Sequence, residues 1–70
     1  MRGTDFFKAK VESGETLTTD IAFKAIHIER LDGVILGLTI AKNYVTDENV
    51  VRQIEEDEQL YRLQIKQLTQ

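Results

Sequence analysis

Apolar and polar positions alternate along the middle of the chain, on both sides of a short turn signal. Two runs rich in β-branched residues flank residues 31–33, whose sequence is Leu-Asp-Gly. If these three residues form a turn with Gly33 in the left-handed conformation, Ile28 pairs with Leu36 and one face of the pair is almost wholly apolar. The alternation therefore predicts a half-buried antiparallel hairpin over about residues 21–41.

The last third of the chain carries the pattern of an amphipathic helix. Thr46 has the side chain of an N-cap, and Asp47 and Glu48 follow it in the first turn, where the helix dipole favours acidic residues. Apolar residues then recur on one side at helical spacing: Val50, Val51, Ile54, Tyr61, Ile65 and Leu68. The sequence predicts a helix over about residues 47–68 and, with the hairpin, a single α+β domain that contains a small antiparallel β-sheet.

The first twenty residues allow two interpretations. A strand over residues 6–11 can turn at Gly14 into a threonine-rich edge strand. Alternatively, residues 5–13 form a short helix that is capped by Thr4 or Asp5 and stops at Gly14. Both interpretations stay open.

An all-helical fold is the alternative to the sheet. One helical stripe runs through the middle of the chain and consists of Ile21, Ala25, Ile28, Leu31, Ile35 and Leu38. Residues 19–44 then form one long helix of a three-helix bundle. Gly33 and Gly37 count against it, since each costs about 1 kcal/mol relative to alanine inside a helix, and so does the density of β-branched residues. The sheet is therefore the favoured prediction.

Size and composition favour a protein that associates with itself. A single domain of 70 residues buries only roughly 60% of its unfolded surface. With no cysteine and one histidine, neither a disulfide nor a zinc site can add stability. We therefore expect a homo-oligomer, most simply a dimer. The net charge of −3 argues mildly against nucleic acid, and the apolar runs are too short for a signal peptide or a membrane span, which predicts a cytoplasmic protein with no membrane partner.

No motif in the chain points to catalysis, a metal or a cofactor. His27 is the only side chain that titrates near neutrality, and no nucleophile accompanies it in a known arrangement. The acidic run at residues 55–58 offers carboxylates, but consecutive helical residues point about 100° apart and cannot converge on one ion. The Gly33 and Gly37 pair has the spacing of close helix packing, a signal with weight mainly in membranes. We expect no enzyme, no metal and no cofactor.

Several short segments resemble the carbon storage regulator family of RNA-binding translational repressors. Residues 14–17, Gly-Glu-Thr-Leu, are similar to that family's opening strand, and residues 34–38 are similar to its V-x-I-G-V strand. The resemblance implies an interlocked β dimer with projecting helices that binds RNA through basic residues, here Lys8 and Lys10. Asp47 stands where the family has an arginine.

The residues together predict a small bacterial or phage regulator or inhibitor that self-associates and binds a macromolecule, preferably a protein. The predicted contact residues lie in the C-terminal helix, where four apolar side chains are flanked by an acidic rim: Leu60, Leu63, Ile65 and Leu68 with Glu55 and Glu58. The alternative is an RNA-binding regulator that contacts phosphate through Lys8 and Lys10.

Overall fold

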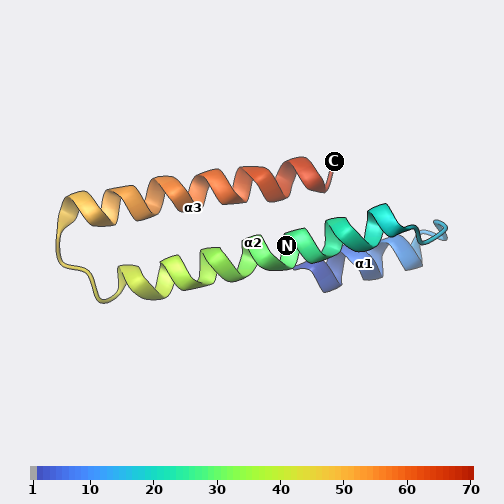
Figure 1. Cartoon of the computed structure of the whole chain (residues 1–70), viewed down its shortest axis with the longest axis horizontal. Coiled ribbons are helices and arrows are strands. Elements are labelled where there is room, and N and C mark those ends of the chain that lie inside the picture. The colour runs from blue at the N-terminus through green and yellow to red at the C-terminus, as the bar shows by residue number, and fades with distance from the viewer. Residues whose placement is uncertain (1) are drawn as a thin grey trace.

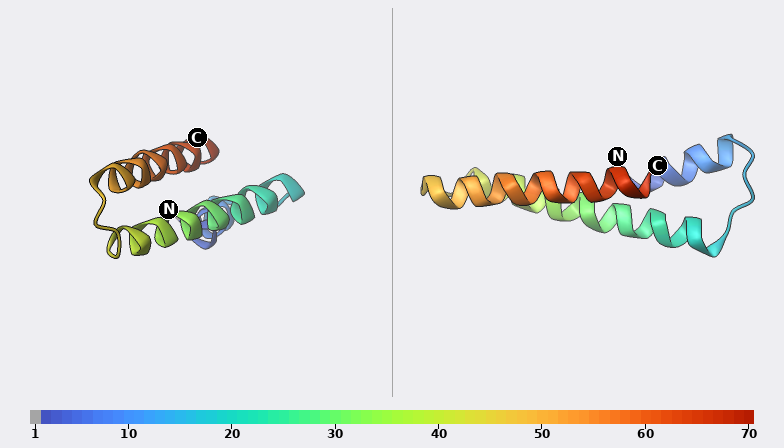
Figure 2. Two further views of the ribbon diagram at one scale, coloured as in Figure 1. Left: turned by 60° about the vertical axis from the view of Figure 1, so that its left-hand side comes forward. Right: turned by 90° about the horizontal axis from the view of Figure 1, so that it is seen from above.

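The computed structural model describes residues 2–70, and these residues form three helices (Figure 1). Helix α1 spans Gly3–Glu12, α2 spans Thr19–Lys42 and α3 spans Glu48–Leu68. Helix α2 is the longest, and both other helices pack on it. Helix α3 runs back antiparallel along one end of α2, whereas α1 runs antiparallel along the other end (Figures 1 and 2).

The predicted hairpin over residues 21–41 and the α+β fold are wrong, because this segment lies within α2 and residues 2–70 contain no strand. The structure has the three-helix alternative instead. Helix α2 begins after Thr18, whose hydroxyl accepts a hydrogen bond from the Ile21 amide at 3.2 Å. Gly33 makes no turn, since Gly14 is the one described residue with a positive φ, at 78°.

The energetic reason for the helix is burial along α2. Ile28, Leu31 and Ile35 are all buried there, and Ile28 has 0% of its surface exposed. Burying one such side chain contributes about 1.5–3 kcal/mol, so the three together exceed the roughly 2 kcal/mol that two glycines cost. The glycine penalty was therefore too small to exclude the helix.

The resemblance to the carbon storage regulator family is wrong for the same reason. That family is built on β-strands, and residues 2–70 hold none. The segment 14–17 that resembled its first strand lies in the connection between α1 and α2, and the segment 34–38 lies inside α2. The RNA-binding alternative loses the fold on which it depended.

The N-terminal segment is a helix rather than a strand. Helix α1 ends at Glu12 and is followed by its C-cap Ser13 and by Gly14, and its first residue packs directly on α2. A Cβ atom on Gly3 would overlap the carbonyl oxygen of Ala25 and lie 3.2 Å from the Cβ of Glu29. Glycine at position 3 therefore lets the start of α1 touch the backbone of α2.

Helix α3 forms where the sequence predicted a C-terminal helix, although its cap differs by one residue. The side chain of Asp47, rather than Thr46, accepts a hydrogen bond from the Asn49 amide at 2.9 Å. The core combines all three helices and consists of Phe6, Ile28, Leu31, Ile35 and Ile65, with Ile21, Ala25, Tyr61 and Leu68 packed around it.

The molecule is elongated, and its surface is large for its mass. It measures 48 × 17 × 16 Å, and its radius of gyration is 14.6 Å, against about 11 Å for a compact chain of this length. Its exposed surface is 5246 Å², roughly 750 Å² more than a compact monomer of its mass has. Helix α3 covers one side of α2 and α1 covers an adjoining side near its start (Figures 1 and 2), and the side of α2 that faces away from both stays exposed.

Candidate helix-packing surface

Helix α2 has a second apolar side, opposite the side that forms the core. We call it the outer stripe, and it consists of Phe23, Ile26, Arg30, Gly33, Gly37 and Ile40 on the helix and of Tyr44, which continues their spacing two residues beyond the helix end. All seven residues are exposed. Their spacing alternates between three and four residues, the repeat by which one helix presents a continuous seam to another. Arg30 is the only charged member.

The second half of the outer stripe is flanked by further exposed apolar side chains. Val34 and Leu36 lie on either side of it, and Leu36 has 61% of its surface exposed. No charged residue occurs between positions 33 and 41. A helix that is apolar on all sides is normally buried on all sides. This second half of α2 therefore has the composition of a central helix, but its outer side is exposed.

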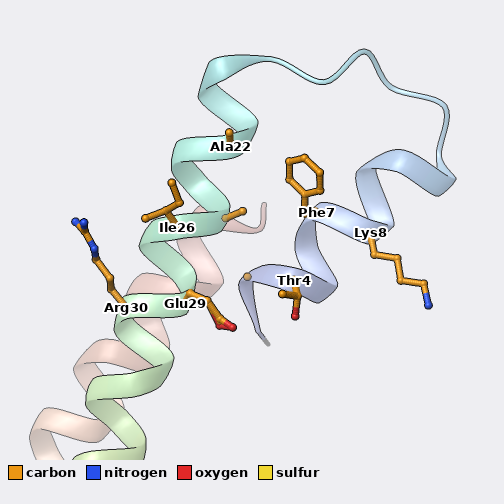
Figure 3. Close-up of a pocket in the computed structure, with 9 residues that line it drawn as sticks. Thr4, Phe7, Lys8, Ala22, Ile26, Glu29 and Arg30 are labelled. Atoms are coloured by element: carbon orange, nitrogen blue, oxygen red, sulfur yellow. The ribbon is translucent and has the colours of Figure 1, made fainter.

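A groove of about 710 Å³ between α1 and α2 continues the outer stripe. It is lined by Gly3, Thr4, Phe7, Lys8, Ala22, Ala25, Ile26, Glu29 and Arg30. Figure 3 shows the Phe7 ring beside Ala22, facing α2, whereas Lys8 extends away from it. Ile26 and Arg30 belong to both the groove and the outer stripe, so the two form one surface.

The glycines of the outer stripe have no role within a single chain. A Cβ atom on Gly33 or Gly37 would meet nothing within 4 Å, and neither residue has a positive φ. Each costs about 1 kcal/mol relative to alanine. Glycine on a helix surface allows another backbone to approach closely. These two residues therefore suit a place where a second helix crosses α2.

One member of the acidic run lies inside the fold. Glu58 has 4% of its surface exposed, and its carboxylate lies 3.2 Å from the Lys42 ammonium and 3.6 Å from the Arg62 guanidinium. The contact between Lys42 and Glu58 is an ion pair only, because the Glu58 oxygen that faces Lys42 has no hydrogen-bond partner. The pair joins the end of α2 to the middle of α3 and thereby helps to fix how these helices align.

The other predicted contact residues of α3 divide between its two sides. Leu60, Leu63 and Glu55 are exposed. Ile65 is buried, and Leu68 packs partly buried against the same core. The structure therefore brings Leu60 and Leu63 to the side of α3 that faces away from α2, and it places the other two apolar residues in the fold.

The two lysines of the RNA-binding alternative have acidic neighbours. The Lys8 ammonium lies 4.0 Å from Glu12, and the Lys10 ammonium lies 3.1 Å from Glu15 and 5.5 Å from the centre of the Phe6 ring. Hydrogen bonds from Lys10, and secondly from Ser13, hold the pKa of the Glu15 carboxyl below its ordinary value. These contacts stabilise the end of α1.

The candidate catalytic and metal-binding groups do not converge. His27 is exposed on α2. In the acidic run, Glu56 is exposed and Asp57 accepts a hydrogen bond from Gln53 at 3.1 Å. Among residues 2–70, no group of three or more histidine, cysteine or acidic side chains is arranged to hold a metal ion. None of the helices over this range combines the length and apolar character that crossing a membrane requires.

The outer stripe is the site that sequence reasoning missed. Its signal was present as a second repeat of three and four residues in α2, offset from the repeat that forms the core. Comparison of the chain with protein families, with curated proteins and with solved structures found no match. The function therefore has to follow from the residues of this chain and their geometry.

Proposed function

We propose that this chain is a non-enzymatic interaction protein that pairs with a second copy of itself through the outer stripe of α2. The observation that carries the proposal is the uncharged, exposed apolar side of α2 between positions 33 and 41. Such a side on a long helix is unfavourable in water and favours contact with another apolar surface.

The surface area supports a second copy as the partner. Each partner of a standard protein interface buries about 800 Å², which is close to the roughly 750 Å² by which this chain exceeds a compact monomer. Covering the half-exposed side chains of Ile26, Val34 or Ile40 would contribute about 1 kcal/mol each. A dimer doubles every such contribution, because both copies bury the same side chains.

The role of the dimer is to bind another protein. Leu60 and Leu63 lie on the side of α3 that faces away from α2, so they stay exposed when the outer stripes are joined. They therefore stay the predicted contact for a regulatory target, with the exposed carboxylate of Glu55 on the same helix.

The test compares two double variants by sedimentation or light scattering. The wild-type chain should have twice the 8.1 kDa mass of one copy, whereas Ile26→Glu with Ile40→Glu should have the mass of one copy, because two carboxylates would enter each apolar seam. Circular dichroism should show that the variant keeps its helices, since both substituted side chains are exposed in the single chain.

The matched control is Leu60→Ser with Leu63→Ser, which also removes two exposed apolar side chains. We expect this variant to keep the dimer mass. If it becomes monomeric while the Ile26 and Ile40 variant stays dimeric, the contact lies on α3 and the proposal is wrong.

A further inference from the structure

We infer that the two copies pack their α2 helices antiparallel and cross at Gly33 and Gly37, with Arg30 of each copy beside Tyr44 of the partner subunit. This inference rests on the proposed self-association. It adds the orientation of the two chains, their alignment and the polar contact that accompanies the apolar seam.

The glycines set the alignment. Gly33 and Gly37 are the two positions of the outer stripe without a side chain, and they are one helical turn apart near its middle. Two helices approach most closely where both lack side chains. An antiparallel crossing at that point places Gly33 opposite Gly37 of the partner subunit. The same alignment brings the turn that follows α2, which carries Tyr44, to Ile26 of the partner subunit.

The charge of Arg30 sets the orientation. In a parallel pair with the same crossing point, the two Arg30 side chains would face each other within an otherwise uncharged seam. In the antiparallel pair, Arg30 lies opposite Ile40 of the partner subunit, and the two arginines are about ten residues, or roughly 15 Å, apart along the axis. Antiparallel helix dipoles also attract, whereas parallel dipoles repel.

Tyr44 offers the matching contact for Arg30. Its side chain is 85% exposed, the largest value among the exposed apolar and aromatic residues of the described chain. Figure 3 shows the Arg30 side chain extending along α2 toward the start of the helix, beside Ile26. In the antiparallel alignment, Tyr44 of the partner subunit lies opposite this part of α2. A guanidinium over an aromatic ring is a favourable pair.

The groove between α1 and α2 fits the same arrangement. Ile26 of α2 and Phe7 of α1 both line the groove, and in Figure 3 Ile26 lies on the side of α2 away from the Phe7 ring, at the edge of the groove toward the outer stripe. The ring of Tyr44 of the partner subunit would enter at this point and contact apolar side chains from both helices. The antiparallel pair therefore fills the groove at each end of the seam, whereas a parallel pair would leave each Tyr44 beyond the end of the partner's groove.

Disulfide trapping tests the orientation, because the chain contains no cysteine of its own. Equal amounts of an Ile26→Cys protein and a Tyr44→Cys protein are mixed, equilibrated and oxidised, and the products are separated by intact mass. Random pairing gives half mixed disulfide. The antiparallel dimer should give mixed disulfide in several-fold excess over both symmetrical products, and Ile26→Cys mixed with Gln59→Cys should show no such excess.

The outcomes separate this inference from the proposed self-association. If the proteins are dimeric by light scattering but form mainly symmetrical disulfides, or none, the orientation or alignment is wrong and the self-association stands. If the wild-type chain itself is monomeric, the proposed function fails. Only dimers with excess mixed disulfide support both.

Discussion

Replacing Gly33 and Gly37 with alanine affects the stability of one chain and the affinity of two chains in opposite directions. In the single chain, a methyl group at either position meets nothing within 4 Å. Alanine is favoured over glycine in a helix interior by about 1 kcal/mol per site. The double variant should therefore gain about 2 kcal/mol in the free energy of unfolding of the monomer.

The same two methyl groups should weaken the dimer. They would lie where the two α2 helices cross, so the backbones must move apart and the neighbouring side chains lose contact. Inserting one methyl group into a close-packed contact costs about 1–3 kcal/mol, and the crossing point would receive four. We expect the dissociation constant to rise by at least a hundredfold, since each 1.4 kcal/mol is a factor of ten.

The assay is urea unfolding at two protein concentrations, combined with sedimentation. At a concentration where the wild type is monomeric, the double variant should unfold at higher urea. At a concentration where the wild type is dimeric, it should lose part or all of this advantage, because dimer formation adds stability only to the wild type. Gly3→Ala is the control, since its methyl group would overlap Ala25 within one chain and should lower stability at both concentrations.

If the double alanine variant is more stable and also associates as tightly as the wild type, the two glycines are not at a helix crossing. The outer stripe could then still form a contact, but the crossing at Gly33 and Gly37 would have to be abandoned.

Two further predictions concern the contacts within one chain. Glu58→Gln should lower the free energy of unfolding by about 1–2 kcal/mol in urea titrations. This is less than the loss of a fully buried ion pair would cost, because Arg62 reaches solvent. An unchanged midpoint of urea unfolding would show that the ion pairs of Glu58 do not contribute. The pKa of Glu15 is lowered in the fold from its ordinary value of 4.5 by the hydrogen bonds from Lys10 and Ser13. The stability that the ionised Glu15 carboxylate contributes is therefore present above pH 4.5 and lost as the pH falls through the folded-state pKa. Glu15→Gln should be less stable than the wild type at pH 7 but equal to it in strong acid. A stability difference that does not change with pH would contradict this prediction.

The sequence identified the C-terminal helix because α3 has one apolar side and one polar side. Its inner residues, such as Ile54, Tyr61 and Ile65, repeat at three and four positions, and apart from Leu60 and Leu63 the outer side is polar. An acidic first turn marks its start. Only its cap was placed one residue early, because both Thr46 and Asp47 can serve in that position.

The prediction for α2 was wrong because this helix has no clear separation into one apolar side and one polar side. Apolar residues occupy both its inner and its outer side, so the same residues also satisfy the alternation of a strand. Gly33 then resembled a hairpin turn, and the cost of two glycines was given more weight than the burial of Ile28, Leu31 and Ile35. The stabilisation from this burial depends on α1 and α3 covering the helix, which local propensity does not include.

The candidate site could not be found before the long helix was known. In the hairpin, Ile26 and Leu36 belong to the covered face, whereas in α2 both are exposed. Apolar residues that the hairpin placed in a core therefore lie on or beside the exposed outer stripe. The exposed leucines of α3 were predictable, because Leu60 and Leu63 fall off the periodic side of a helix whose type was clear.

Pairing through the outer stripe is tested first by the mass of the wild-type chain as a function of concentration, measured by sedimentation equilibrium at moderate salt. We expect a shift from 8.1 kDa to twice that value as the concentration rises, with no larger species, and no shift for Ile26→Glu with Ile40→Glu. A mass of one copy for the wild-type chain at every concentration would show that the outer stripe does not join two copies.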